Sequence, residues 1–227
     1  MAKRGVIYIV WGQQPRKALE RSISSLSKVH PELPIKVFEV DDLKGPMSLL
    51  QKSKMSDLSP FDETLYLDAD TVIFDRLDFG FEKAVQFGIS CSVCENPWAK
   101  RYKLSISGDV VEYNTGVLFF TKAVKELFGR WKELSNSADS SIVYVDLDGR
   151  FCKMPHNDQA SFSLAVEQLQ INPFVLPLNW NYRPEFQKSF FGPVKIWHSY
   201  PEPPQLFFEL AEYYRTPESI IQYHYQR

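Results

Sequence analysis

The chain of 227 residues is 44% hydrophobic, 15% aromatic and 24% charged, a globular composition that excludes disordered, collagen-like and low-complexity classes. Its 26 basic and 28 acidic residues give a net charge of −2, which excludes a general polycation for binding nucleic acid or an acidic membrane. The apolar run 6–11 is far shorter than the ~18 residues of a spanning helix, and three cysteines do not form a disulfide framework. We therefore expect a soluble, cytoplasmic protein with no membrane span.

The chain opens with the pattern of a strand, a helix and a second strand. Residues 5–11 are apolar and rich in β-branched side chains, and residues 18–29 carry apolar side chains at helical spacing. Residues 35–40 alternate like a strand, which completes a βαβ unit and implies a parallel sheet. After a helical stretch at 47–58, the run 64–67 is apolar on both faces, as a central buried strand requires.

The second half of the chain is mixed and rich in proline. We expect a helix at 122–134, a hairpin of 142–147 and 150–154, and further helices at 158–169 and 205–214. Further strands are expected at 87–93, 110–112, 117–120, 174–178 and 194–197. No repeat or linker marks a second domain, so residues 1–227 are predicted to form one α/β domain. Its first half, 1–120, is Rossmann-like, and its second half, 121–227, is more irregular.

Two aspartates follow the predicted central strand. In an extended chain the side chains of Asp68 and Asp70 leave on the same side, with Cα atoms ~6.5–7 Å apart. Carboxylates at the end of a buried strand repel each other unless a divalent cation or a proton neutralises them. The pair therefore predicts a Mg²⁺ or Mn²⁺ site. The spacing alone is not specific, because Asp146 and Asp148 repeat it beside a glycine turn that explains them structurally.

Four fragments, taken in order, resemble the motifs of the GT-A nucleotide-sugar glycosyltransferases, most closely the glycogenin-like family eight. They are residues 61–73, 114–119, 157–160 and 194–198. The resemblance spans most of the chain and implies a single GT-A-like domain with a mixed central sheet. It also implies that residues 1–120 bind the nucleotide sugar and that residues 121–227 bind the acceptor.

The resemblance implies a role for each matching position. The metal ion, Mn²⁺ or Mg²⁺, would be held by Asp68, Asp70 and His198. The catalytic residues beside the donor sugar would be Asn114, Asp158 and Gln159. A UDP-sugar donor would also lie against Trp11, Gly12, Lys52 (with Lys54 as the alternative), Ala69 and Gly116.

The sequence departs from the family pattern after the histidine. Relatives often continue with glycine and then a Lys-Pro that clamps the pyrophosphate, whereas residues 199–204 contain no lysine. The diphosphate would then be met by the metal ion together with Lys52, Arg16 or the segment 101–103. Trp180 and Tyr182 lie among polar side chains and are candidates for stacking on a sugar.

The combined prediction is a metal-dependent glycosyltransferase of the hexosyltransferase type, which moves a sugar from a UDP-sugar to a hydroxyl of a carbohydrate or other acceptor. Family eight implies retention of configuration, whereas an inverting enzyme would use Asp158 as its base. A haloacid-dehalogenase-like phosphatase with Asp68 as nucleophile is one alternative, because residues 68–73 also fit that motif. Another is a non-catalytic nucleotide-sugar-binding module of a longer protein. Additional domains and a homo-oligomer also remain open.

Overall fold

The computed structural model describes residues 3–12, 15–41, 45–95, 109–137, 142–145, 149–154, 157–187, 189–191, 193–213 and 222–224. The helices are α1 (Arg16–Val29), α2 (Met55–Leu58), α3 (Asp78–Phe87), α4 (Lys125–Ser137), α5 (Asp158–Gln168) and α6 (Gln205–Tyr213). Short 3₁₀ helices cover Gly45–Lys54, Lys122–Val124 and Leu178–Trp180. The strands are β1 (Arg4–Val10), β2 (Ile35–Glu39), β3 (Glu63–Leu67), β4 (Thr71–Ile73), β5 (Ile89–Val93), β6 (Tyr113–Thr121), β7 (Ile142–Val145), β8 (Phe151–Met154), β9 (Phe174–Leu176), β10 (Ser189–Phe191), β11 (Ile196–His198) and β12 (Gln222–His224).

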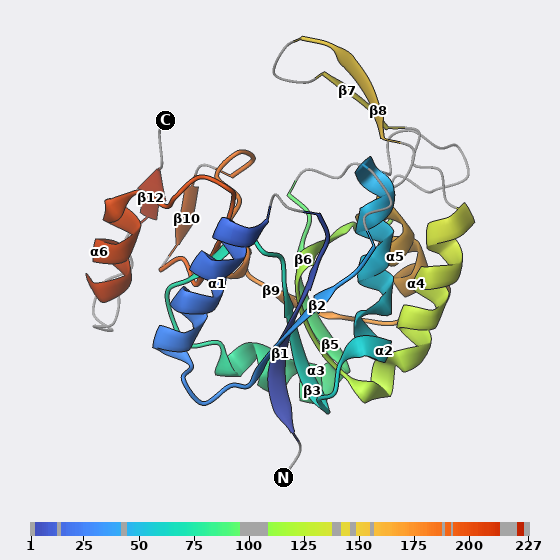
Figure 1. The fold of residues 1–227 in the computed structure, drawn as a ribbon, viewed down its shortest axis with the longest axis horizontal. Coiled ribbons are helices and arrows are strands. Elements are labelled where there is room, and N and C mark those ends of the chain that lie inside the picture. Colours follow the sequence, from blue (N-terminus) through green and yellow to red (C-terminus); the bar gives the residue numbers. More distant parts are fainter. Residues whose placement is uncertain are drawn as a thin grey trace.

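The main sheet has six strands in the order β2-β1-β3-β6-β5-β9 (Figure 1). Strand β1 pairs in parallel with both β2 and β3, which confirms the βαβ opening. Strand β6 runs antiparallel between β3 and β5, and β9 is again parallel to β5. The sheet is therefore mixed, as predicted.

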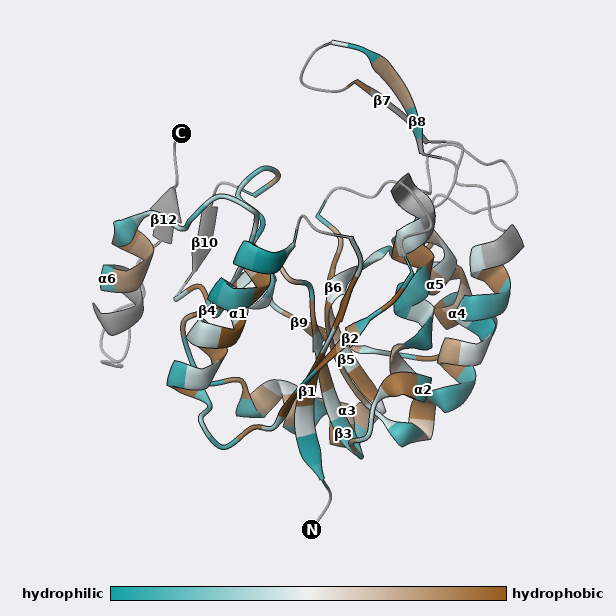
Figure 2. Cartoon of the chain, viewed as in Figure 1, coloured by the Kyte–Doolittle hydropathy of each residue, from teal (hydrophilic) through white to brown (hydrophobic). Residues whose placement is uncertain are grey.

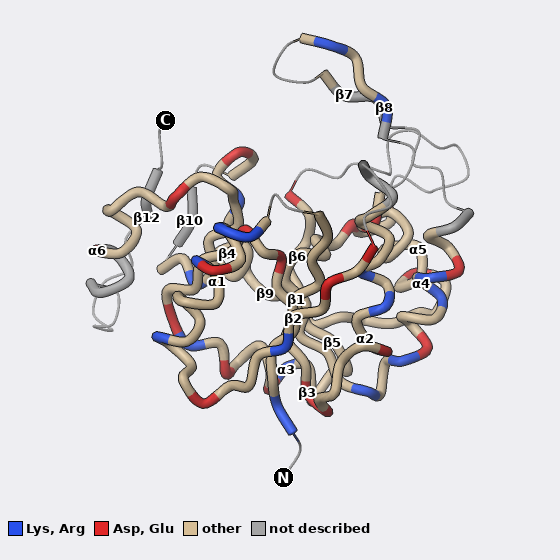
Figure 3. The backbone as a smooth tube through the Cα atoms, in the orientation of Figure 1, with Lys and Arg blue, Asp and Glu red and all other residues tan. Residues whose placement is uncertain are grey.

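Helices cover both faces of this sheet. Successive side chains of each strand point to opposite faces, and the central strands are apolar on both, so each face is buried under helices. On one face, Ile7, Ile9 and Tyr66 pack in a buried cluster with side chains of α4 and α5. On the other face, Val6 and Tyr8 belong to a second cluster with side chains of α1 and α3. Figure 2 shows the hydrophobic residues concentrated on the central strands, and Figure 3 shows basic and acidic residues interspersed on the outer helices. The result is a helix-sheet-helix sandwich that fixes the ends of β1, β3 and β6.

A short antiparallel pair of strands lies beside the main sheet. In this pair β4 and β11 are in register, with Thr71 opposite His198 and Ile73 opposite Ile196. The neighbouring buried cluster includes Trp197 and joins this pair to α6. The pairing brings a segment near the end of the chain beside the residues that follow β3.

The observed elements differ from the predicted ones at a few places. The expected helix at 47–58 is mainly a 3₁₀ helix, and the expected strand at 110–112 is absent, since β6 begins at Tyr113. Helix α3 and strand β4 were not predicted from the sequence. The hairpin of β7 and β8 is confirmed, although Asp146 and Asp148 lie outside the described residues. None of the described helices has the length and hydropathy needed to cross a membrane.

Candidate metal centre

Three possible metal ligands meet where β3 and β11 end. Asp68 follows β3, Asp70 lies two residues later, and His198 is the last residue of β11. One ligand atom from each of these side chains lies within 4.8 Å of the other two. The Nε2 atom of His198 is 3.5 Å from Oδ2 of Asp68 and 3.4 Å from Oδ1 of Asp70. The structure thus brings together the three residues that the resemblance assigned to the metal.

The two carboxylates converge through a turn and not through an extended strand. Residues 69 and 70 form this turn, and β4 begins at Thr71. The Thr71 hydroxyl donates to the backbone oxygen of Asp68 at 2.9 Å, and the backbone N–H of Ser199 donates to the backbone oxygen of Asp70 at 3.0 Å. The sequence therefore predicted the convergence correctly but attributed it to the wrong backbone geometry.

Gly116 on β6 allows the three side chains to approach the sheet closely. A Cβ atom at this position would lie 2.2 Å from Cε1 of His198 and 2.7 Å from Oδ2 of Asp68. Both distances are far below ordinary van der Waals contact, which is ~3.5–4.0 Å between carbon atoms. Only glycine fits here without displacing a ligand.

A buried lysine connects Asp68 to Asp158. Lys52 is 4% exposed, and its Nζ lies 2.8 Å from Oδ2 of Asp68 and 3.2 Å from Oδ2 of Asp158. Asp158 also accepts a hydrogen bond from the hydroxyl of Thr115. The predicted donor-binding lysine therefore neutralises two carboxylates under the site, and the alternative, Lys54, is not part of this ion-pair network as described.

The charges of this centre shift one another's pKa values. Burial by itself would lower the pKa of Lys52, but Asp158 and Asp68 outweigh it and raise the pKa above its usual range. Burial would raise the pKa of the Asp68 carboxyl, but Lys52 and His198 hold it well below its usual range. In His198, burial is opposed chiefly by the charge of Asp70, and the pKa rises from 6.5 to about 9. Asp68 is thus an anion, and His198 is a cation at neutral pH in the metal-free protein.

Asn114 and Gln159 are both buried, and only Asn114 is linked to the centre by hydrogen bonds in the described part of the chain. Asn114 is 2% exposed, and its Oδ1 accepts hydrogen bonds from the backbone N–H of Gly116 and the side-chain amide of Asn181. The amide of Gln159, at the start of α5, donates to Oε1 of Glu112 at 3.2 Å. The cap of α5 is Asn157, because its Oδ1 accepts the backbone N–H of Ala160 at 3.1 Å.

The remaining predicted donor contacts lie at the edge of the site or outside it. Trp11, at the end of β1, is partly buried and packs against the core cluster on the α4 side. Gly12 is exposed and has a φ of 66°, which favours glycine. Ala69 is in the turn between the two aspartates, whereas Arg16 is an exposed residue that pairs with Glu39 at 3.9 Å. The segment 101–103 lies outside the described residues.

The prediction that Trp180 and Tyr182 stack on a sugar is wrong. Trp180 is 5% exposed and Tyr182 is fully buried, and each ring packs in a hydrophobic cluster. Between them, Asn181 directs its side chain to the metal centre, where its Oδ1 lies 2.7 Å from Nδ1 of His198. The sequence signal was the polar stretch 179–183, but the side chain in it that contacts His198 is that of Asn181.

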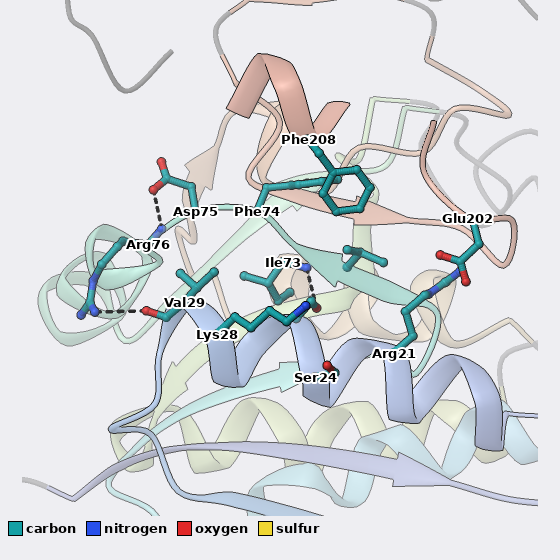
Figure 4. Close-up of a pocket in the computed structure, with 12 residues that line it drawn as sticks. Arg21, Ser24, Lys28, Val29, Ile73, Phe74, Asp75, Arg76, Glu202 and Phe208 are labelled. Carbon is teal, nitrogen blue, oxygen red and sulfur yellow. Dashed lines mark hydrogen bonds and ion pairs between the residues drawn. The ribbon is translucent and has the colours of Figure 1, made fainter. Parts of the chain in front are cut away.

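Of two pockets in the described part of the chain, the smaller borders the centre, and the larger is lined by none of the three candidate ligands. One, of about 310 Å³, is lined by Asp70 and His198 together with Arg183, Glu185 and Tyr200. The other, of about 720 Å³, is a groove between α1 and the segment 72–76 that Phe208 of α6 closes on the far side (Figure 4). Arg21 lines this groove and donates to the backbone oxygens of Ser199 and Tyr200 at 2.8 and 2.9 Å, so it anchors the loop after His198. Apart from Asp70 and His198, sequence reasoning identified none of these pocket residues as part of a site.

No protein-family model matches the sequence, and no curated protein is similar enough to it to count as a relative. Solved structures do resemble the fold. The galactosyltransferase LgtC, solved in complex with donor and acceptor sugar analogs, is 15% identical with a TM-score of 0.58 over 94% of this chain and 98% of that one. Mouse xyloside xylosyltransferase 1 is 14% identical with a TM-score of 0.56 over 88% of this chain and 99% of that one. GlyE of Streptococcus pneumoniae TIGR4 is 12% identical with a TM-score of 0.54 over 93% of this chain and 60% of that one.

These likenesses bear out the fold class predicted from the sequence. The chain has the single-domain GT-A-type α/β fold of these glycosyltransferases, with a six-stranded mixed sheet at its centre.

Proposed function

We propose that the protein is a metal-dependent glycosyltransferase that moves a sugar from a UDP-sugar to a hydroxyl of a carbohydrate or other acceptor. One observation carries the proposal: Asp68, Asp70 and His198 converge within 4.8 Å at the end of the central strand of a GT-A-type fold. The structure of LgtC in complex with donor and acceptor sugar analogs is consistent with this chemistry on this fold. The resemblance to family eight further favours a hexosyl donor and retention.

The donor set fits a divalent cation. Two carboxylate oxygens and one imidazole nitrogen suit Mn²⁺ at least as well as Mg²⁺. The absence of a side chain at Gly116 keeps His198 and Asp68 close enough to share one ion. When bound, the ion would act as a Lewis acid that offsets the negative charge growing on the leaving diphosphate.

The chain's own residues hold the site in an ionised and ordered state. Lys52 forms ion pairs with both Asp68 and Asp158 in a buried environment, where an unpaired carboxylate would be strongly disfavoured. Because the Asp158 carboxylate is bound by both Lys52 and Thr115, it is poorly placed to act as a free base. This arrangement favours retention over inversion at Asp158.

We assign the acceptor to the pocket of about 310 Å³ beside Asp70 and His198. Its volume is at the lower end of the range for small-molecule sites, ~300–1,000 Å³. The carboxylate of Glu185, the guanidinium of Arg183 and the phenol of Tyr200 line it, and such groups accept from or donate to sugar hydroxyls.

The test is an assay of sugar release from a panel of UDP-sugars with Mn²⁺, with and without a chelator. We expect turnover that depends on the metal and is lost in Asp68→Asn and Asp70→Asn, whose folds survive by circular dichroism. Asp62→Asn is the matched control, because this exposed carboxylate lies at the opposite end of β3. Activity that is unaffected by Asp70→Asn, or by removal of the metal, would contradict the proposal.

Assays of phosphate-ester hydrolysis, beryllium fluoride binding and UDP binding, run beside the sugar-release assay, separate the alternatives. A phosphatase with Asp68 as nucleophile would hydrolyse simple phosphate esters and bind beryllium fluoride at that residue. A non-catalytic module would bind UDP with Mn²⁺ but release no sugar from any donor. Metal-dependent release of sugar supports only the transferase.

A further inference from the structure

A chain of buried hydrogen bonds runs from the backbone of β6 to the candidate metal ligand. The N–H of Gly116 donates to Oδ1 of Asn114 at 2.9 Å, and Nδ2 of Asn181 donates to the same oxygen at 2.8 Å. The Oδ1 of Asn181 then lies 2.7 Å from Nδ1 of His198. Asn114 and Asn181 are each 2% exposed, and His198 is 8% exposed.

The direction of every bond in this chain follows from its first member. A backbone N–H can only donate, so the atom of Asn114 that faces Gly116 must be its oxygen. The atom of Asn181 that meets this oxygen must be its donor, Nδ2, which leaves Oδ1 facing the imidazole. Because a carbonyl oxygen can only accept, Nδ1 of His198 must carry a proton.

The backbone around Asn181 holds this geometry. The N–H of Tyr182 donates to the backbone oxygen of Ile196 at 2.8 Å, and the N–H of His198 donates to that of Tyr182 at 2.8 Å. The buried rings of Trp180 and Tyr182 anchor the segment on either side of Asn181. The amide therefore has little freedom to rotate away from the imidazole.

We propose that Asn181 is a positioning residue that fixes the proton of His198 on Nδ1 and so dedicates Nε2 to the metal ion. The inference rests on the proposed function, because it assumes that a metal binds at this centre. The geometry agrees with it, since Nε2 is the nitrogen that faces Asp68 and Asp70. A hydrogen bond to the second nitrogen fixes the orientation and tautomer of a ligating histidine and increases its basicity.

The test combines nitrogen NMR with metal titration. In protein labelled with ¹⁵N-histidine and loaded with diamagnetic Zn²⁺, long-range ¹H–¹⁵N spectra distinguish the protonated nitrogen of His198 from the metal-bound one. We expect the proton on Nδ1 in the wild type. In Asn181→Leu we expect the uniform Nδ1–H signal to be lost and the Mn²⁺ affinity measured by calorimetry to fall ~10–100-fold.

Two further variants separate positioning from general stability. Asn181→Asp keeps an acceptor for Nδ1, so we expect it to retain the Nδ1–H form of His198 and the Mn²⁺ affinity. It also places an oxygen against Oδ1 of Asn114, so we expect its melting temperature to fall. Asn179→Leu is the matched control, because its amide donates to the backbone oxygen of Pro193 at 2.7 Å, away from His198. We expect this variant to lose stability without any change in tautomer or Mn²⁺ affinity.

The outcomes distinguish this inference from the proposed function. If the wild type binds Mn²⁺ but Asn181→Leu binds it as tightly as Asn179→Leu does, the role of Asn181 is refuted and the transferase proposal stands. A wild-type His198 that carries its proton on Nε2 also refutes the inference. If neither Mn²⁺ nor Zn²⁺ binds, the proposed metal centre fails, and the inference fails with it.

Discussion

Replacement of Gly116 by alanine places a methyl group where the ligands meet. The new Cβ atom would lie 2.2 Å from Cε1 of His198, whereas carbon atoms in contact are ~3.5 Å apart or more, so the ring must move by ~1.3 Å. Metal–ligand distances deviate from their ideal values by only ~0.2 Å. We therefore expect Gly116→Ala to remove His198 from the coordination sphere and to weaken Mn²⁺ binding by more than tenfold. The accompanying overpacking should cost ~1–3 kcal/mol of stability.

The assay is isothermal calorimetry with Mn²⁺, supported by thermal unfolding in the presence of EDTA. Gly129→Ala is the matched control, because a Cβ at this exposed position of α4 meets no atom within 4 Å. This control should keep the wild-type Mn²⁺ affinity and gain ~1 kcal/mol of stability from its higher helix propensity. Wild-type Mn²⁺ affinity in Gly116→Ala would refute the reasoning.

Three further expectations follow from the charges of the centre. Lys52→Met leaves Asp158 buried without its ion-pair partner and leaves Asp68 with His198 alone, so it should lower the free energy of unfolding by ~3–5 kcal/mol in denaturant titrations. Lys54→Met should change the free energy of unfolding by less than ~0.5 kcal/mol. The pKa of His198 is raised to about 9, so metal binding at Nε2 displaces a proton. The Mn²⁺ affinity measured by calorimetry should therefore increase ~tenfold per pH unit up to about pH 9. An affinity that stays constant above pH 6.5 would contradict this expectation. In EDTA, the protonated His198 stabilises the fold fully below pH 6.5, and this stabilisation should be lost as the pH rises through about 9. Melting curves of His198→Gln should not show this loss. The same pH dependence of melting in the wild type and in His198→Gln would contradict the assignment.

The parts of the site that are local in sequence could be predicted. Asp68 and Asp70 follow a run of buried apolar residues, so their place at a strand end is evident from the pattern alone. His198 is remote in sequence, and its place beside them depends on the pairing of β11 with β4. Strand β4 has only three residues, too few for a detectable alternation, so only the family resemblance indicated this ligand.

Side-chain contacts beneath the site were beyond sequence reasoning. The role of Lys52 as a buried counter-ion depends on the 3₁₀ segment that carries it beneath β3, where the pattern predicted a helix. Asn181 was overlooked because the aromatic residues beside it gave a stronger signal, yet those rings are buried. Helix α3 was missed because Phe79 and Val85 are exposed by 42% and 56%, which blurs its apolar stripe.

The most direct measurement of the central claim is a crystal structure grown with Mn²⁺ and UDP, in which anomalous scattering locates the ion. The account predicts one manganese peak ~2.1 Å from carboxylate oxygens of Asp68 and Asp70 and from Nε2 of His198. A peak elsewhere in the molecule, or an imidazole that stays paired with the carboxylates while the nucleotide binds without the ion, would contradict it.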